Sequence, residues 1–309
     1  MLDFRDQTFG IELEFTGITR KKAAGAIAMT IRGDYKYDHR GGVYDRRIIT
    51  AQDGRQWTIC RDGSVSGSTY EHGGEFVTPV CRYEDIEKVQ DCVRALRNAG
   101  AQVDSTCGLH IHVGADKHTA KSLRNLVYTF KAKQNLIYKA AGAEDRMTNH
   151  FSKVIGDDLI NNLKKIRDLD MNSLGDTWYR TYDAESDRNA HYNDSRYHGI
   201  NLHSVWYHGT VEFRLFHATL HAGEVRAYIN LILAMSAAAI NSKRASAEVL
   251  DNGNDKYAMR CWLLRLGFIG DDYKNIRKHL LKRLEGNAAW RNDPETYDSY
   301  NNRNNRQTA

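Results

Sequence analysis

Apolar and polar residues alternate along three short stretches of the chain that lie far apart in the sequence. The stretches are residues 10–15 (GIELEF), 107–113 (CGLHIHV) and 210–215 (TVEFRL). Alternation with a period of two is typical of a β-strand, whose successive side chains point to opposite faces. Each stretch therefore predicts a strand with one apolar face in a core and one polar face that can form a site.

Similar patterns, with turn residues between them, predict the remaining elements. Strands are expected at residues 9–16, at 35–38 and 43–49 in a hairpin around residues 39–42, at 57–62, 75–79 and 107–113, and at 199–205 and 210–216 in a second hairpin around residues 206–209. Helices are expected at residues 85–98, 119–141, 157–166, 224–243, 256–266 and 271–284.

The polar faces of the three strands carry acids, imidazoles and an arginine instead of the Thr, Lys, Gln and Ser of an ordinary wet face. The pairs that share a face are Glu12 with Glu14, His110 with His112, and Glu212 with Arg214. If the strands lie in one sheet, three carboxylates line one site. Two unit charges about 4 Å apart repel by roughly 4 kcal/mol at an effective dielectric near 20, so the arrangement needs bound cations.

Two further acids, Asp62 and Glu75, lie at the end and the beginning of predicted strands and fit the same site. Carboxylates with one or two imidazoles suit hard divalent cations such as Mg²⁺ or Mn²⁺. Cys107 alternates with the apolar positions and is expected to pack in the core. Arg214 either neutralises Glu212 or binds a phosphate or carboxylate through two hydrogen bonds. Metals and an arginine directed at one place are typical of phosphoryl chemistry.

The candidate site draws on positions from 12 to 214, so residues 1–220 are expected to form one domain. Residues 221–300 are expected to add helices packed on it, and residues 301–309 a flexible tail. Residues 142–196 carry few signals, and a connection of that length is a candidate lid or acceptor-binding region. The longest apolar run, residues 228–240, is shorter than the roughly 18–20 residues that cross a bilayer and predicts a buried core helix.

Composition narrows the class of protein. The 309 residues are 41% hydrophobic and 27% charged, which is ordinary globular usage. Five cysteines without a CxxC pair argue against a disulfide framework or zinc knuckle, and predict reduced thiols in the cytoplasm. The net charge of +5 is modest. The segments 32–61 and 274–306 are rich in arginine and lysine. We expect these side chains to be exposed to solvent, and contact with phosphates is the alternative. No GxxxxGK[ST] sequence occurs, so any nucleotide is not held by a P-loop.

Four motifs occur in order along the chain: GIELEF at residues 10–15, the stretch from Asp62-Gly63-Ser64 to Glu75, CGLHIHV at residues 107–113 and GTVEFR at residues 209–214. At these motifs the chain resembles the glutamine synthetase and glutamate–cysteine ligase superfamily, and most closely its smaller carboxylate–amine ligases, the amidoligases. No single motif is specific, but the four in this order are. The resemblance covers residues 9–220.

The resemblance implies an α+β fold with a concave antiparallel sheet, a glutamine synthetase-like half-barrel, backed by helices. It implies binding of ATP and of two or three Mg²⁺ or Mn²⁺ ions. A substrate carboxylate would be phosphorylated to an acyl phosphate, and an amine would then attack to give an amide or isopeptide bond. The chain lacks the large N-terminal domain and the ammonium-site loops of glutamine synthetase, which argues against ammonia as the acceptor and against a large ring assembly.

The resemblance also implies roles for single residues, carried over by motif. Six side chains would hold metal ions. On the ion that bridges the ATP phosphates they are Glu12, His110 and Glu212, and on the ion nearer the substrate carboxylate they are Glu14, Glu75 and Asp62. His112 and Arg214 would contact the transferring phosphoryl group. Arg196 and Asn201, which precede the Glu212 strand, would contact the nucleotide or the substrate.

Three functions are compatible with this sequence. The favoured one is an ATP-dependent carbon–nitrogen ligase whose partners are ATP, a carboxylate and an amine of an amino acid, peptide, protein or cell-wall fragment. A metal-dependent nuclease or phosphodiesterase would use the same acids and ions on a nucleic acid backbone. In a non-enzymatic basic nucleic-acid-binding module, the His and Glu pairs would be structural. The favoured function needs neither a membrane nor a nucleic acid, and it leaves oligomer formation open.

Overall fold

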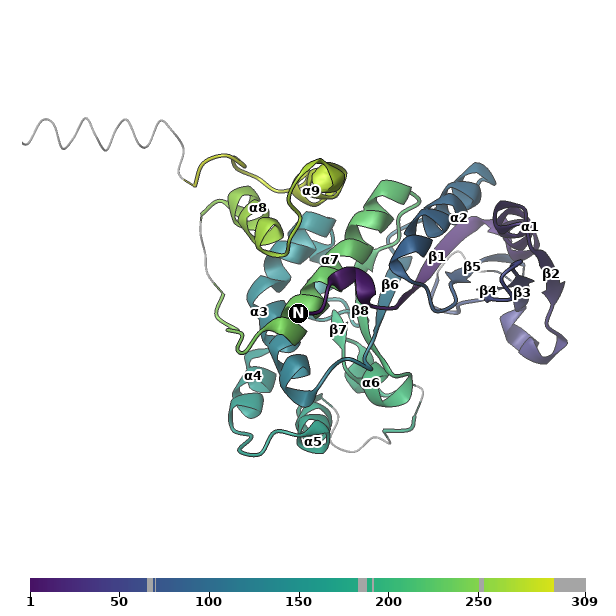
Figure 1. Ribbon diagram of the computed structural model, residues 1–309. Helices are drawn as coiled ribbons and strands as arrows, with labels where there is room; N and C mark the ends of the chain where they lie inside the picture. The colour runs from purple at the N-terminus through teal and green to yellow at the C-terminus, as the bar shows by residue number, and fades with distance from the viewer. Residues whose placement is uncertain (66–68, 70, 183–187, 191, 250–252, 292–309) are drawn as a thin grey trace, which may run out of the picture.

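The computed structural model describes residues 1–65, 69, 71–182, 188–190, 192–249 and 253–291 (Figure 1). The expected tail at 301–309 and part of the polar stretch within 142–196 lie outside these residues. The described chain combines one layer of antiparallel strands with helices, which confirms the α+β class.

Eight strands form one antiparallel sheet in the order β2-β3-β4-β5-β1-β6-β8-β7. Their bounds are β1 Phe9–Thr19, β2 Asp34–Tyr37, β3 Arg47–Thr50, β4 Gln56–Cys60, β5 His72–Val77, β6 Gly108–Gly114, β7 Ile200–Asn201 and β8 Thr210–His217. The three strands with polar pairs, β1, β6 and β8, are consecutive neighbours in the sheet, with only β7 beyond them among the described strands. The condition on which the predicted site depended is therefore met.

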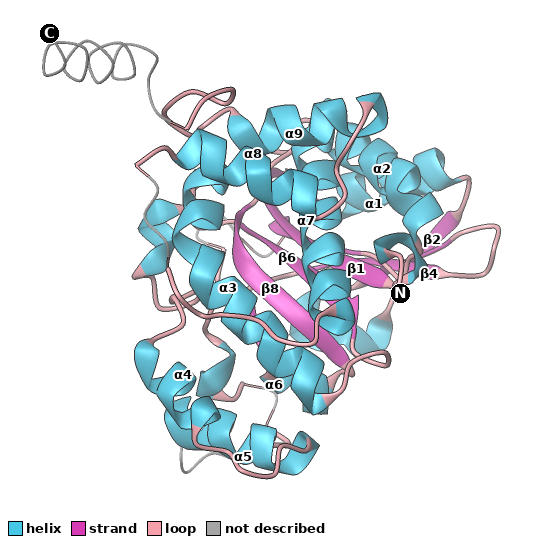
Figure 2. Ribbon diagram, turned by 60° about the vertical axis from the view of Figure 1, so that its left-hand side comes forward, coloured by secondary structure: helices cyan, strands magenta, loops and turns pink. Residues whose placement is uncertain are grey.

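Helices cover one face of this sheet and extend beyond its end (Figures 1 and 2). Their bounds are α1 Arg20–Ile31, α2 Ile86–Asn98, α3 Ala120–Ala141, α4 Asp157–Lys164, α5 Met171–Tyr182, α6 His203–Tyr207, α7 Ala222–Asn241, α8 Asp255–Arg265 and α9 Lys274–Leu281. Helix α1 contacts β3, β4 and β1, α7 contacts β6, and α3 contacts β8. The short 3-10 helices η2 His39–Tyr44, η4 Glu144–Met147 and η5 Asp194–Arg196 lie in connections.

The core lies between the sheet and these helices. Strand β1 shows how the sequence builds it, because Phe9, Ile11, Leu13 and Phe15 all point to the helices and are at most 2% exposed. Burying one such side chain contributes roughly 1.5–3 kcal/mol. One cluster of buried apolar residues continues from β1 to the end of the C-terminal helices. Those helices are therefore packed on the sheet domain, and Cys107 lies in the same core. All five cysteines have free thiols.

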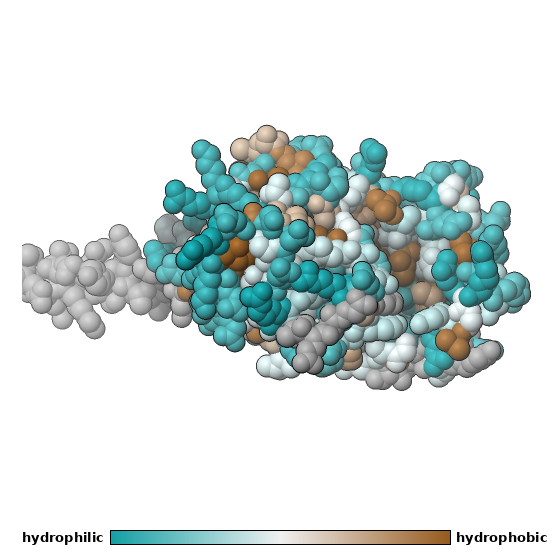
Figure 3. Space-filling view, turned by 90° about the horizontal axis from the view of Figure 1, so that it is seen from below, coloured by the Kyte–Doolittle hydropathy of each residue, from teal (hydrophilic) through white to brown (hydrophobic). Residues whose placement is uncertain are grey.

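Helix α7 is long and apolar enough, by length and composition, to cross a membrane. However, 78% of its most apolar window is buried inside the protein, where it contacts α2, α3, α9 and β6. The prediction of a buried core helix is confirmed. Seen from below, hydrophilic residues cover most of the described surface, and apolar residues form small separate areas (Figure 3).

The structure corrects the predicted elements in four places. Helix α1 was not predicted at all, and α5 lies in the stretch 142–196 where only one helix was expected. Residues 43 and 44 belong to η2, so the first hairpin has a longer connection and a shorter second strand than predicted. In the second hairpin β7 has only two residues, and α6 replaces the rest of the expected strand.

Candidate active site

A cavity of about 310 Å³ lies on the face of the sheet that carries the polar pairs. All ten residues singled out in the sequence line it: Glu12, Glu14, Asp62, Glu75, His110, His112, Arg196, Asn201, Glu212 and Arg214. This face is covered, and several of its ionisable side chains are at most 6% exposed: Glu14, His110, Glu212 and Arg214.

Strand register sets the arrangement of the central side chains. Glu12 of β1 pairs with His110 of β6, and His112 of β6 pairs with Glu212 of β8. At His110 the β6–β8 register shifts, because Ile111 pairs with Phe213 whereas Leu109 pairs with Phe216. Strand β8 thus has one extra residue opposite His110, a β-bulge of the kind that redirects side chains beside active sites.

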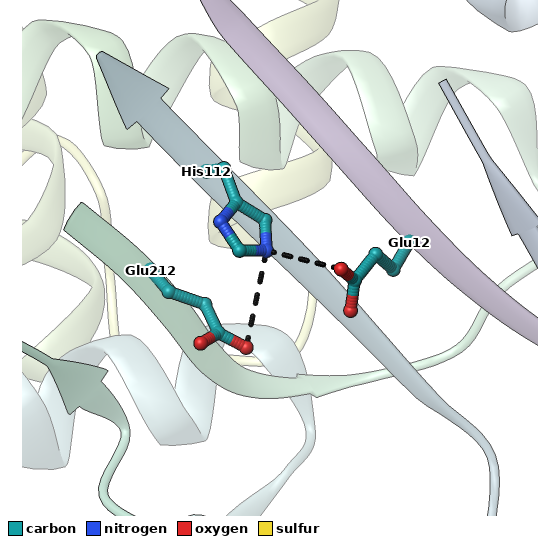
Figure 4. Close-up of side chains that lie close together, drawn as sticks. All are labelled: Glu12, His112 and Glu212. Atoms are coloured by element: carbon teal, nitrogen blue, oxygen red, sulfur yellow. Dashed lines mark ion pairs between the residues drawn. The ribbon is translucent and has the colours of Figure 1, made fainter. Parts of the chain in front are cut away.

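Three side chains from three strands converge on one point (Figure 4). His112 Nε2 lies 3.4 Å from Glu12 Oε1 and 3.9 Å from Glu212 Oε1. One potential ligand atom from each of Glu12, His112 and Glu212 lies within 4.8 Å of the others, close enough to hold one metal ion. We call these three residues the cation group.

The second imidazole lies beside this group. His110 Nδ1 is 3.1 Å from Glu12 Oε2 and 3.7 Å from Glu212 Oε1. The resemblance implies that His110, and not His112, holds the metal ion together with Glu12 and Glu212. In the structure both imidazoles contact both acids, and the register brings His112 directly opposite Glu212.

The other three predicted ligands, Glu14, Glu75 and Asp62, also line the cavity. Glu14 of β1 pairs directly with Glu75 of β5, and Asp62 follows β4. Asp62 Oδ1 accepts hydrogen bonds of 2.6 Å from the backbone and the hydroxyl of Ser64. Among the described residues, only the cation group satisfies the close spacing of a three-ligand metal site. We call Glu14, Glu75 and Asp62 the acidic group.

The electrostatics of the cation group favour ionised acids. Although burial acts against ionisation, contacts with the imidazoles of His110 and His112 hold the pKa of Glu12 well below its ordinary value. Burial opposes ionisation of Glu212 too, but the charge of Arg214 lowers the pKa of Glu212 to about 2. The cation group therefore offers carboxylate oxygens at neutral pH.

The acidic group behaves in the opposite way. Burial, followed by the charges of Glu12 and Asp62, raises the pKa of Glu75 well above its ordinary value. Burial also raises the pKa of Glu14. The carboxyl groups of the acidic group lie near one another, and too few positively charged side chains lie beside them to balance their charges. A bound divalent cation would remove this repulsion.

Replacing Glu75 by glutamine should stabilise the metal-free protein and weaken its response to metal. The pKa of Glu75 is higher in the folded state than in the unfolded state, where it is near 4.5. As the pH rises through these two pKa values, ionisation of Glu75 therefore lowers the stability of the folded protein. In EDTA, we expect Glu75→Gln to increase the free energy of unfolding by on the order of 1 kcal/mol or more at pH 8, and by less at pH 5. The melting temperature should rise accordingly. With Mn²⁺ the wild type should gain more stability than the variant. A variant that melts below the wild type at pH 8 in EDTA would show that the acids do not repel.

Arg214 and Asn201 complete the surroundings of Glu212. The Arg214 guanidinium pairs with Glu212 and donates to the backbone carbonyl of Phe151 at 3.3 Å. Asn201 Nδ2 donates to Glu212 Oε2 at 2.6 Å, whereas Asn201 Oδ1 is buried without a hydrogen-bond partner. A buried acceptor beside a carboxylate cluster is suited to a bound cation or a ligand donor. The donor set of the cavity therefore fits a hard divalent cation.

Arg196 lies on the cavity wall together with aromatic side chains. Its guanidinium carbon is 5.6 Å from the ring centre of Tyr192 and 5.8 Å from that of Tyr197. Phe151 packs edge-on against Tyr197, with ring centres 5.7 Å apart. Arginines and rings of this kind bind anions and planar groups.

Several site residues were not predicted from the sequence. Arg146 of η4 is 4% exposed and donates to the backbone carbonyl of Arg214 at 3.2 Å. The Cys60 thiol donates to Glu75 Oε1 at 3.1 Å. His112 Nδ1 contacts the hydroxyl of Thr210 at 2.9 Å. Strand alternation could have placed Cys60 and Thr210 on the site face. Nothing in the local sequence of Arg146 distinguishes it from a surface arginine.

The fold and the cavity define an α+β protein with a covered, highly charged pocket and perturbed pKa values, which is the arrangement of an enzyme active site. The family model described as "Putative amidoligase enzyme" matches residues 5–236, about three quarters of the chain. The chain belongs to this amidoligase family, whose description names a ligase. The match continues past residue 220 into α7. A search of curated proteins found no match to the chain.

Proposed function

We propose that the protein is an ATP- and Mg²⁺- or Mn²⁺-dependent carboxylate–amine ligase that forms an amide or isopeptide bond through an acyl phosphate. The observation that carries this proposal is the cation group beside Arg214, which places ionised carboxylates and a fixed guanidinium around one point. Family membership supports ligase chemistry. The antiparallel sheet is compatible with the concave half-barrel of the glutamine synthetase superfamily, to which we assign the chain as part of the proposal.

The proposed reaction has two steps. An oxygen of the substrate carboxylate attacks the γ-phosphorus of ATP, and ADP leaves with the electron pair of the broken P–O bond. The nitrogen of the amine then attacks the acyl carbon, phosphate leaves, and the proton that the amine loses passes to solvent. Divalent cations would neutralise charge on the phosphate oxygens during transfer.

The residues of this chain would position the reactants. Glu12 and Glu212, with His112 as the imidazole whose position satisfies the spacing of a three-ligand site, would hold the ion at the phosphates. Arg214 and His110, whose Nη1 and Nδ1 atoms lie 3.4 Å apart, would face the transferring group. The acidic group would hold one or two further ions near the substrate carboxylate. We place the protein in the cytoplasm as part of this proposal, because ATP is available there.

Trapping with hydroxylamine tests this function without knowledge of the natural amine. Hydroxylamine converts an acyl phosphate to a hydroxamate, so the protein, Mn²⁺, ATP and a pool of carboxylic acids should yield hydroxamate and ADP in equal amounts. The yield should fall to background without the metal or without the acids. ADP release that is independent of any carboxylate would contradict the ligase assignment.

The nuclease and nucleic-acid-binding alternatives have less support in the structure. They depend on the basic segments 32–61 and 274–306 contacting phosphates. Within residues 32–61 four arginines already lie within 4 Å of acids: Arg40 and Arg46 beside Asp38, Arg47 beside Asp45, and Arg55 beside Asp53 and Asp85. Such pairing favours the solvated face expected from the sequence. Salt-sensitive binding of DNA or RNA in the absence of ATP would restore these alternatives.

A further inference from the structure

We propose that Arg20, a buried arginine at the start of α1, is a positioning residue that holds the acidic group in place for metal binding. This inference rests on the proposed ligase function, in which the acidic group holds ions near the substrate carboxylate. It adds the residue that keeps those acids at the spacing an ion needs. Arg20 is not among the described residues that line the cavity, and it acts through the backbone that carries the acids.

Arg20 joins segments that are distant in the sequence. Helix α1 lies beside the strands β2 to β5 (Figure 1), and Arg20, its first residue, is 0% exposed. A buried guanidinium is stable only when acceptors surround it. Its Nε donates to Asp45 Oδ2 at 2.7 Å, and its Nη1 donates to the backbone carbonyls of Gly73 at 2.5 Å and His72 at 3.2 Å. The carbonyl of Thr69 accepts longer bonds of 3.4 and 3.5 Å from Nη1 and Nη2.

One of these connections leads to Glu75. Strand β5 begins at His72, so Arg20 binds the carbonyls of the first two residues of β5, and Glu75 is the fourth. Between them, a Cβ at Gly74 would lie 2.2 Å from the carbonyl oxygen of Cys60 and 3.3 Å from Cδ of Arg20. The start of β5 therefore packs directly against β4 and the stem of Arg20. A change in the arginine side chain would shift this start, and Glu75 with it.

The other connection leads to Asp62. Asp45, which accepts from Arg20, has a φ of +41°, a backbone conformation that residues other than glycine adopt rarely. The ion pair helps to hold this conformation. The carbonyl of the preceding residue, Tyr44, accepts a hydrogen bond of 2.7 Å from the backbone N–H of Arg61. Because Asp62 follows Arg61 directly, its backbone is connected to Arg20 through this hydrogen bond and the ion pair.

Such support matters because carboxyl groups of like charge do not hold one another in place. A divalent cation accepts ligand distances within only about 0.2 Å of its preferred values, so the segments that carry Glu75 and Asp62 need a fixed spacing before the ion binds. An apolar side chain at position 20 could fill the same volume, and such replacements of buried ion pairs are often just as stable. The hydrogen bonds of Arg20 define a spacing that apolar packing would leave less well defined.

Titration with Mn²⁺, followed by electron paramagnetic resonance, tests this role. Free Mn²⁺ gives a signal that bound Mn²⁺ loses, so the titration counts the ions bound per chain and gives their dissociation constants. The proteins are the wild type, Arg20→Met, Arg20→Lys, Glu75→Gln and Ala24→Gly. Ala24→Gly is the control for stability, because Ala24 is a fully buried residue of the same helix and glycine weakens a helix interior. Thermal melting establishes that each protein is folded at the temperature of the titration.

We expect the wild type to bind more than one Mn²⁺ ion per chain, one of them at the cation group. Arg20→Met should weaken the remaining binding by about tenfold or more, as the loss of a residue that orients metal ligands does, and should change the ion of the cation group by less than about twofold. Glu75→Gln should show the same pattern. Ala24→Gly should lower the melting temperature and keep all the ions. In the hydroxamate assay, Arg20→Met should need about tenfold more Mn²⁺ for half of its maximal rate.

Arg20→Lys keeps the charge and gives a result even if Arg20→Met does not fold. A single ammonium cannot replace the planar fork that reaches both Asp45 and Gly73, so we expect weakening by about threefold or more. Unchanged Mn²⁺ binding in the folded Arg20 variants, equal weakening in Ala24→Gly, or a wild type that binds a single ion would overturn this role. A wild type that binds no Mn²⁺ would instead overturn the proposed function, and this inference with it.

Discussion

Replacing Glu12 by glutamine is expected to lower the rate of ATP-dependent hydroxamate formation by about 10²–10³-fold or more. Glu12 is the carboxylate on which His110 and His112 both converge, at 3.1 and 3.4 Å. An amide keeps the size of the side chain but removes the charge that a divalent cation needs. The Mn²⁺-dependent rise in melting temperature should shrink in parallel, because metal bound only to the folded state stabilises it by mass action.

Glu87→Gln in α2 is the matched control, since Glu87 is exposed on the helical side of the molecule. It should keep both the hydroxamate rate and the Mn²⁺-dependent shift. If Glu12→Gln retained the rate and the shift of the wild type, the cation group would have no part in the reaction.

Replacing Arg214 by methionine should lower the free energy of unfolding by about 3–5 kcal/mol and abolish hydroxamate formation. Arg214 and Glu212 are 6% and 3% exposed and form an ion pair. Removing one partner of a buried ion pair leaves an uncompensated charge, which is far more costly than removing both. Denaturant unfolding at pH 7 measures this loss.

The double variant Arg214→Met with Glu212→Gln separates stability from chemistry. It should regain most of the lost free energy of unfolding, because no buried charge is left unpaired, and it should stay inactive. Arg94→Met is the control at the surface: Arg94 pairs with Asp91 at 2.5 Å, but the two side chains are 43% and 53% exposed, so the loss should stay below about 1 kcal/mol. A double variant no more stable than Arg214→Met would mean that Arg214 stabilises the fold by packing and not by charge.

The site face could be predicted from sequence because strand alternation is a strictly local rule. The positions of Glu12, Glu14, His110 and Glu212 within their strands fix which face each occupies, once core side chains such as Leu13 define the other face. The cavity accordingly contains all ten expected residues. Their roles as ligands stay a prediction.

What was missed depends on interactions that local sequence does not encode. Four of the twelve residues of α1 are alanines, of which Ala23 and Ala24 are fully buried. Such small side chains give a weak apolar stripe although their spacing is helical. The β-bulge opposite His110 arises from pairing between strands about a hundred residues apart. Arg146 reaches Arg214 because η4, which follows α3, contacts β8.

Anomalous X-ray diffraction from crystals grown with Mn²⁺ and AMP-PNP tests the central claim most directly. The account predicts a manganese peak about 2.0–2.2 Å from oxygens of Glu12 and Glu212 and from one of the two imidazoles, with phosphate oxygens of the nucleotide on the same ion. Manganese bound only elsewhere, or a triphosphate bound away from these side chains, would contradict it.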